Sequence, residues 1–123
     1  MAESPELHKE IVTIKVDIKD IKATQELEVL LNKERYIKYV EKVIGKSRER
    51  ARVFLAVNGA RTLKEISEIT GIKLQNVSRS KKILEAHHLI YRLPDSGIYA
   101  KPRWVRILNI DEYIRQKFNI EGL

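Results

Sequence analysis

The sequence predicts a mainly α-helical fold with one small β-hairpin and, at the N-terminus, a long helix of the coiled-coil type. Three patterns support this class. Apolar residues recur every three or four positions from Leu7 onward, two shorter helical patterns flank Gly71, and alternating apolar residues surround a turn at residues 94–97. The chain has 123 residues, which corresponds to one domain with an appended helix.

Residues 1–46 are expected to form a helical dimerisation arm. The spacings of four and three that mark an a/d stripe join Leu7, Ile11, Ile14, Ile18 and Ile21. The phase slips at Gln25, so the arm is either one helix with a discontinuity or two helices that meet near residues 23 and 24. Because so small a domain cannot bury a long stripe, we expect a homodimer. A hairpin within one chain, a stripe that covers the chain's own domain, and a strand near residues 11–16 are the alternatives.

Residues 47–123 are expected to form a second domain that begins with two short helices. Ser47 is placed to cap the first helix, which ends near residues 58 and 59. Thr62 and Glu65 form a capping box at the start of the second helix, and Gly71 ends it. The residues expected to face inward are Ala51, Phe54, Leu55, Val57, Leu63, Ile66 and Ile69.

A hairpin and a last helix are expected after a third helix at residues 75–87. Residues 90–93 and 98–100 alternate as strands do, and the turn between them has Pro to fix φ and Gly to supply a positive φ. Residues 104–108 are predicted to add a short further strand. Asn109 is placed to cap the last helix, whose apolar face consists of Ile110, Tyr113, Ile114 and Phe118.

The positive charge is concentrated in the second half of the chain. The formal net charge is +7; residues 1–46 hold nine basic and nine acidic residues, so residues 47–123 carry all of it. Residues 71–106 hold eight basic residues against two acidic ones, Glu85 and Asp95. This asymmetry favours a surface for a polyanion, although a basic surface also serves solubility alone.

The helix at residues 75–87 separates an apolar face from a polar one. On a helical wheel Val77, Ser80, Leu84 and His88 point inward, whereas Gln75, Arg79, Lys82 and Ala86 point outward with Ser78 at the flank. Arg and Lys donate to guanine, Gln and Asn pair with adenine, and a helix N-terminus favours phosphate. The outward face is therefore suited to the DNA major groove.

The segments LKEISEITGI, NVSRSKKILE and LIYRLPDSGIY resemble a winged helix-turn-helix domain, most closely that of prokaryotic ArsR and MarR transcriptional regulators. The resemblance covers residues 47–107, and Lys73 and Lys81 depart from it, where a capping Ser or Thr and a leucine are common. It implies DNA contacts by the recognition helix and the residues that flank or follow the wing: Lys73, Gln75, Asn76, Ser78, Arg79, Lys82, Arg92, Lys101 and Arg103.

The expected function is that of a dimeric regulator of transcription bound to double-stranded DNA, with each recognition helix in a major groove and each wing on the backbone. A protein-binding adaptor in transcription or replication machinery is the runner-up. A nucleoid-coating protein and an RNA-binding protein are further alternatives. The resemblance also leaves room for a small-molecule effector.

We expect neither an enzyme nor a cofactor. No Ser/His/Asp set, phosphate-binding glycine loop or carboxylate pair stands out, and His87 and His88 lack further metal ligands in a chain without cysteine. The sequence has neither a long apolar run nor a signal peptide, so the expected location is the cytoplasm, at the nucleoid.

Overall fold

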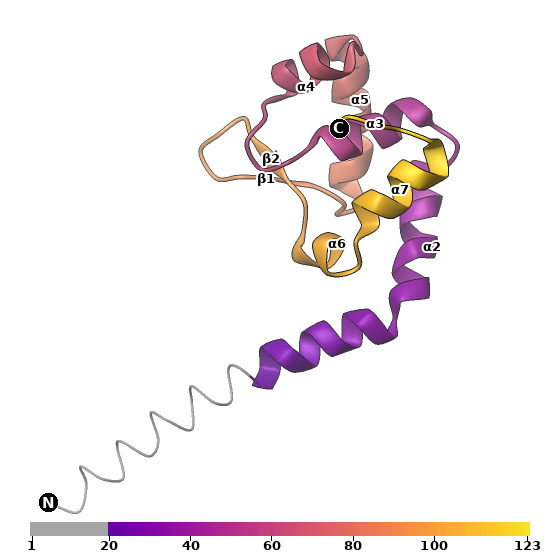
Figure 1. Cartoon of the computed structure of the whole chain (residues 1–123). Helices are drawn as coiled ribbons and strands as arrows, with labels where there is room; N and C mark the ends of the chain where they lie inside the picture. The colour runs from indigo at the N-terminus through magenta and orange to yellow at the C-terminus, as the bar shows by residue number, and fades with distance from the viewer. Residues whose placement is uncertain (1–19) are drawn as a thin grey trace, which may run out of the picture.

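The computed structural model describes residues 20–123 (Figure 1), and this part is mainly helical with one two-stranded antiparallel sheet, as predicted. A helical segment spans residues 20–31. The elements that follow are α2 (Lys33–Ile44), α3 (Arg48–Ala56), α4 (Leu63–Thr70), α5 (Leu74–Ala86), β1 (Tyr91–Arg92), β2 (Tyr99–Ala100), α6 (Arg103–Ile107) and α7 (Ile110–Phe118).

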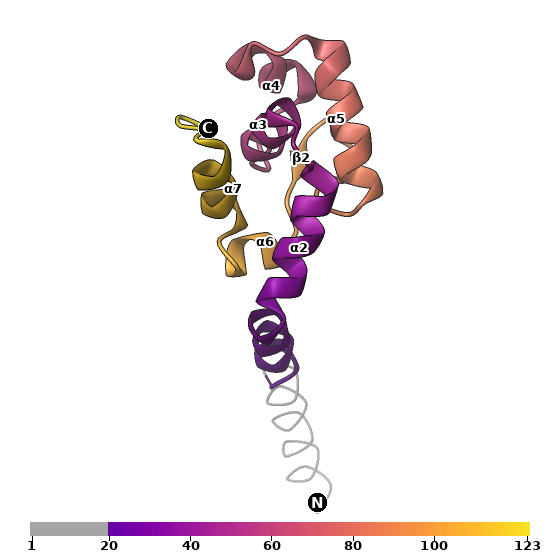
Figure 2. The ribbon, with the colours of Figure 1, turned by 90° about the vertical axis from the view of Figure 1, so that its right-hand side faces the viewer.

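Helix α3 is the centre of the fold: Figure 2 shows α5 on one side of it, α7 on the other and α4 above it. Its N-terminus is capped as predicted, because the Ser47 side chain accepts a hydrogen bond from the Arg50 amide. Phe54 is fully buried, and the other positions expected to face inward on this segment, Ala51, Leu55 and Val57, are buried too. Burial of one large side chain contributes roughly 1.5–3 kcal/mol, so α3 organises the core.

The predicted capping box and the glycine stop of α4 are both confirmed. The Thr62 side chain accepts a hydrogen bond from the Glu65 amide, and the Glu65 carboxylate accepts one from the Thr62 amide. Gly71, at φ 71°, ends the helix in a left-handed conformation. The expected inward position of Ile69 is wrong, since this side chain is 48% exposed while Thr70 is buried. Strict spacing by three drifts around an α-helix, and here the buried positions are i and i+4.

The arm bends at Asn32, not near residues 23 and 24, where the helix is continuous (Figure 1). The Asn32 side chain donates a 2.7 Å hydrogen bond to the Glu28 carbonyl at the bend. Beyond it, α2 buries Val40, Val43 and Ile44 in the main core. The core therefore includes residues on both sides of the boundary expected between residues 46 and 47. The predicted stripe residues Leu7, Ile11, Ile14 and Ile18 lie outside the described residues, and Ile21 is 56% exposed.

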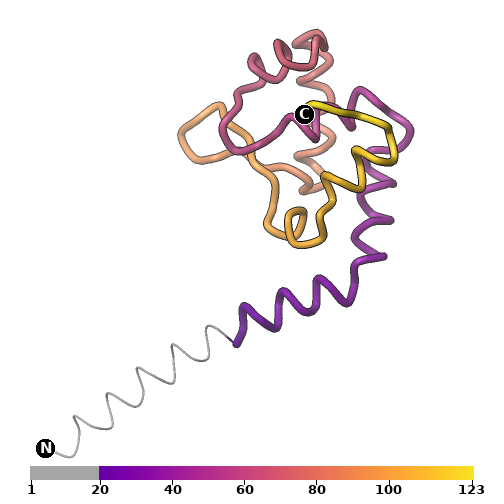
Figure 3. Tube along the Cα trace, viewed as in Figure 1, coloured from indigo at the N-terminus to yellow at the C-terminus, as the bar shows by residue number. Residues whose placement is uncertain are grey.

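The hairpin forms where it was predicted, with Tyr91 paired to Ala100 and Arg92 to Tyr99. Its returning strand also bridges to the loop before α4, through Thr62 and Ile98, and Figure 3 traces the two segments side by side. The hairpin is therefore fixed to the start of α4.

The predicted third strand at residues 104–108 is wrong, because residues 103–107 form helix α6. Val105 and Leu108, three residues apart, are both buried, which is helical spacing. Trp104 packs on Tyr36 of α2, with ring centroids 5.1 Å apart. This contact between distant segments overrides the local alternation that favoured a strand.

Helix α7 confirms the last predicted element. Ile110 and Ile114 are buried, and Tyr113 and Phe118 pack partly buried against the core. Asn109 precedes the helix at φ 53° without a side-chain capping bond. None of the helices formed by residues 20–123 has both the length and the apolar content to cross a membrane.

Candidate nucleic-acid interface

Helix α5 is held on α3 and α4 by the inward residues that the wheel predicted. Val77 and Leu84 are fully buried, and Ser80, which is 7% exposed, is small enough for a close helix crossing. The fourth predicted inward residue, His88, is exposed, so this expectation is wrong. The helix ends at Ala86, His88 turns to φ 62°, and Leu89 is buried instead. A helical wheel does not apply beyond the last turn.

The outward face of α5 carries positive charge that forms no ion pair with the rest of the described chain. Gln75, Arg79 and Lys82 are exposed. The acid of this helix, Glu85, is already paired with Lys81 at 3.3 Å. Among residues 20–123, neither Arg79 nor Lys82 forms an ion pair. Two cationic side chains one turn apart therefore project from the same face as Gln75.

The N-terminus of α5 adds to this field. Lys73 occupies the position before the helix and is exposed, and no side chain caps the first turn. Uncapped amides at the positive end of a helix of 13 residues attract an anion. Lys73 thus leaves the backbone donors open at a position where a capping Ser or Thr is common in winged helix-turn-helix domains.

The two flanks of α5 differ. On one side, a shallow hollow of about 270 Å³ is lined by Ser47, Glu49, Asn76, Arg79 and Ser80. Glu49 is the carboxylate of this lining, and it lowers the attraction for an anion there. Asn76 and Ser78 are half-buried, so they lie at the edges of the exposed face rather than on its crest.

On the other flank α5 contacts the hairpin through Lys81. Its ammonium lies 5.6 Å from the centre of the Tyr99 ring on β2, while its stem is largely covered. Arg92 on β1 is exposed, and its Nε donates a 2.6 Å hydrogen bond to the Ser96 carbonyl of the turn. Lys81, unexpected at a position where a leucine is common, therefore links α5 to the hairpin through a cation–π contact.

Two of the predicted contact residues are engaged elsewhere. The Lys101 side chain is only 11% exposed, and it donates to the Asp111 carboxylate at 2.8 Å and to the Leu55 carbonyl at 3.3 Å. Burial lowers the pKa of Lys101, and the Asp111 carboxylate opposes that effect. Arg103 forms an ion pair with Glu26 of the arm. Because Lys101 is held by Asp111 and Leu55, away from the outward face of α5, it is not part of the proposed interface.

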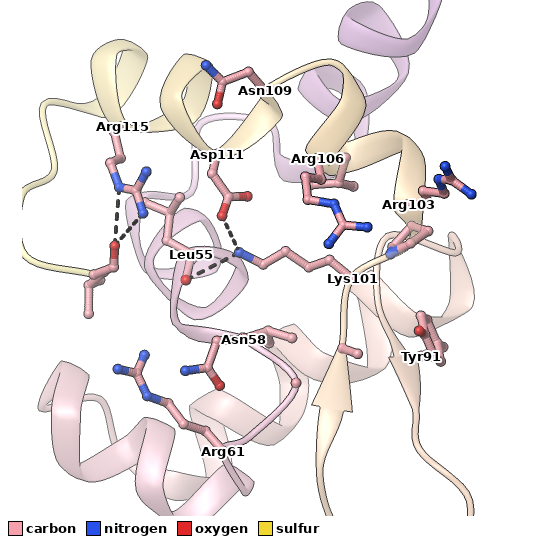
Figure 4. Close-up of a pocket in the computed structure, with 16 residues that line it drawn as sticks. Leu55, Asn58, Arg61, Tyr91, Lys101, Arg103, Arg106, Asn109, Asp111 and Arg115 are labelled. Atoms are coloured by element: carbon pink, nitrogen blue, oxygen red, sulfur yellow. Dashed lines mark hydrogen bonds and ion pairs between the residues drawn. The ribbon is translucent and has the colours of Figure 1, made fainter. Parts of the chain in front are cut away.

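The sequence did not predict a second basic group, which surrounds Lys101 (Figure 4). Arg61, Arg106 and Arg115 come from three separate segments and line one cavity with Lys101. No local spacing joins these positions, so only the tertiary structure reveals them. Among residues 20–123, no three His, Asp or Glu side chains gather as metal ligands.

Comparison with known protein families, curated proteins and solved structures finds no match for this chain.

Proposed function

We propose that this chain is a sequence-specific, double-stranded DNA-binding protein of the winged helix-turn-helix class that regulates transcription as a homodimer. The observation that carries the proposal is the outward face of α5, where Gln75, Arg79 and Lys82 stand exposed with no acidic partner among the described residues. Arg and Lys donate to guanine edges and to phosphates, and Gln makes paired hydrogen bonds to adenine.

The arrangement around α5 supports this class. Helices α4 and α5 are joined by a turn at residues 71–73, and a two-stranded hairpin follows α5 directly. In a helix-turn-helix protein the second helix enters the major groove. The contact between Lys81 and Tyr99 keeps the hairpin beside that helix, so α5 and Arg92 are able to touch the same duplex.

The arm supports the homodimer. Its helix at residues 20–31 exposes large apolar side chains, which are Ile21 (56%), Leu27 (55%), Leu30 (51%) and Leu31 (75%). Four such side chains on one short helix are costly in water and suit a second copy of the same helix. A dimer would place its two α5 helices in successive major grooves, with half-sites ~10 bp or a multiple apart.

A second candidate, the protein-binding adaptor, is favoured by two apolar side chains near the turn before α5. Ile69 is 48% exposed and Leu74 is 50% exposed. In a DNA complex such side chains would contact thymine methyl groups, whereas in an adaptor they would contact an apolar surface of the partner.

Fluorescence anisotropy with duplex DNA tests the proposal. Fragments of the source genome and a random duplex of the same length are titrated with the full chain at several salt concentrations. We expect a steep loss of affinity with salt, because lysine and arginine contacts displace counterions from phosphate. We also expect some fragments to bind at least about tenfold more tightly than the random duplex, a difference of about 1.4 kcal/mol.

Polyglutamate of matched charge is the control. Equal affinity for polyglutamate and for every duplex would favour the adaptor. Steep salt dependence with no preference among duplexes would instead indicate a nucleoid-coating protein. Sedimentation of the free chain tests the dimer separately, since a monomer at micromolar concentration would contradict that part of the proposal.

A further inference from the structure

A cavity of about 670 Å³ lies away from the outward face of α5, between the end of α3, the hairpin, α6 and α7 (Figure 4). Its volume is within the ~300–1,000 Å³ typical of sites for small ligands. Apolar lining residues include Leu55, Val57 and Val105, and Tyr91, which is 47% exposed, lines it too. The cavity therefore combines space, apolar walls and an opening to solvent.

The charged side chains of the lining are strongly unbalanced. Among the described residues that line the cavity, one has an acidic side chain, Asp111. Its carboxylate is paired with Lys101 at 2.8 Å. Four arginines complete the charged lining, and they are Arg61, Arg103, Arg106 and Arg115.

The arginines differ in how far they are engaged. Arg103 pairs with Glu26, and Arg115 lies 3.7 Å from Glu112 and also donates to the Leu123 carbonyl. Arg61 donates one hydrogen bond of 3.0 Å, to the Ala56 carbonyl at the end of α3, which leaves its charge without a carboxylate. Arg106 is exposed and forms no ion pair within residues 20–123.

The surroundings of Lys101 contain more positive than negative charge. Its pKa is lowered first by burial, and the nearby guanidinium groups of Arg115 and Arg61 lower it further. Like charges held around a partly desolvated space repel one another, and a bound anion would remove that repulsion.

We propose that this cavity binds a small ligand that carries at least two phosphate charges, with Arg61 and Arg106 as the principal contacts. Arginine is well suited, because its planar fork donates two parallel hydrogen bonds to phosphate oxygens. The apolar wall and Tyr91 would cover an uncharged part of the ligand, as in a nucleotide. A duplex is too wide to enter a cavity of this size, so a small molecule fits the site better than a polynucleotide does.

Calorimetric titration of the full chain with inorganic pyrophosphate, and separately with ADP, at constant ionic strength tests this site. We expect saturable binding, and tighter binding of ADP would identify an organic phosphate as the natural class. Arg106→Gln should weaken binding about tenfold or more, since it removes charge-assisted hydrogen bonds to the phosphate. The exposed position of Arg106 makes this variant mild for folding, which circular dichroism checks.

Lys38→Gln is the matched control, because Lys38 is an exposed cation on α2 that does not line the cavity. It removes the same charge and should leave the affinity for pyrophosphate unchanged. Equal losses in the two variants would mean that only net charge matters, and the proposal would be overturned.

Backbone amide NMR shifts locate the ligand without any variant. On addition of pyrophosphate the largest changes should fall on Asn58, Gly59, Ala100 and Lys101, which line the cavity. Changes centred on residues 73–82 would place the anion on α5 and overturn the cavity site, as would an absence of saturable changes. Because these amides lie off α5, failure of the DNA proposal leaves this result interpretable.

Discussion

If α5 binds DNA as proposed, replacement of Arg79 by alanine should separate recognition of DNA bases from general attraction to DNA. Arg79 lies at the centre of the outward face of α5, one turn from Gln75, and it is exposed. It forms no ion pair with any residue of the described part of the chain. Its loss should therefore change the free energy of unfolding by no more than about 0.5 kcal/mol, the usual range for such surface positions.

The effect on DNA should be much larger. A side chain that contacts a base edge contributes about 1–3 kcal/mol to discrimination, which corresponds to a loss of about five- to 150-fold on a preferred duplex. Affinity for random duplex should change little, because a base contact is not made there. Lys82→Ala should instead weaken binding to both duplexes alike. It should also lower the slope of log affinity against log salt concentration by about 0.9, as expected for one lost phosphate contact.

Anisotropy titrations of Arg79→Ala on preferred and random duplexes, at three salt concentrations, measure these effects. Lys38→Ala is the control, because it removes one exposed positive charge from α2 rather than from α5. Equal losses on the two duplexes would refute the assignment of Arg79 to base recognition. An effect of Lys38→Ala as large as that of Arg79→Ala would refute the placement of DNA on α5.

Three further predictions concern the fold and the dimer. Leu84→Ala removes a fully buried side chain of α5 and should lower the free energy of unfolding by about 2–5 kcal/mol, seen as a lower denaturant midpoint; a loss below about 1 kcal/mol would contradict the packing. Hydrogen bonding by Tyr113 and then Lys117 lowers the pKa of Glu41 from its ordinary value of 4.5, so its stabilising effect is full above pH 4.5 and is lost as the pH falls through the folded-state pKa. Thermal unfolding of Glu41→Gln should therefore depend less on pH below 4.5 than that of the unmodified chain, and parallel curves would disprove this. Leu27→Ser combined with Leu31→Ser should shift the sedimenting species from dimer to monomer without a change in helical content, and a double variant that stays dimeric would move the interface off this part of the arm.

Local signals were enough to predict most elements of the described fold. The capping box of Thr62 and Glu65 and the positive φ of Gly71 are set by residues only a few positions apart, and both appear as expected. The inward positions of Val77 and Leu84 follow from helical geometry alone. Short-range chemistry and periodicity therefore account for where α4 begins and ends and for which face of α5 is buried.

Contacts between distant segments explain what the sequence could not predict. The strand expected at residues 104–108 is a helix because Trp104 packs on Tyr36, which is 68 positions earlier in the chain. Lys101 was assigned to DNA from its place after the hairpin, but its side chain pairs with Asp111 on α7. A wheel or an alternation pattern contains no information on either partner, and the same is true of the arginines around the cavity.

The role of a cation on α5 depends on the face of the helix that it occupies rather than on its residue type. The three cations of α5 lie within four positions of one another. Lys81 is engaged with Glu85 and the Tyr99 ring, whereas Arg79 and Lys82 are exposed and form no ion pair within the described chain. A rotation of 100° per residue is enough to produce this division. Lys81 therefore contributes to the position of the hairpin beside the outward residues of α5. Substitutions at Arg79 and Lys82 should alter what the helix recognises at little cost to the fold, whereas a substitution at Lys81 should disturb the position of the hairpin first.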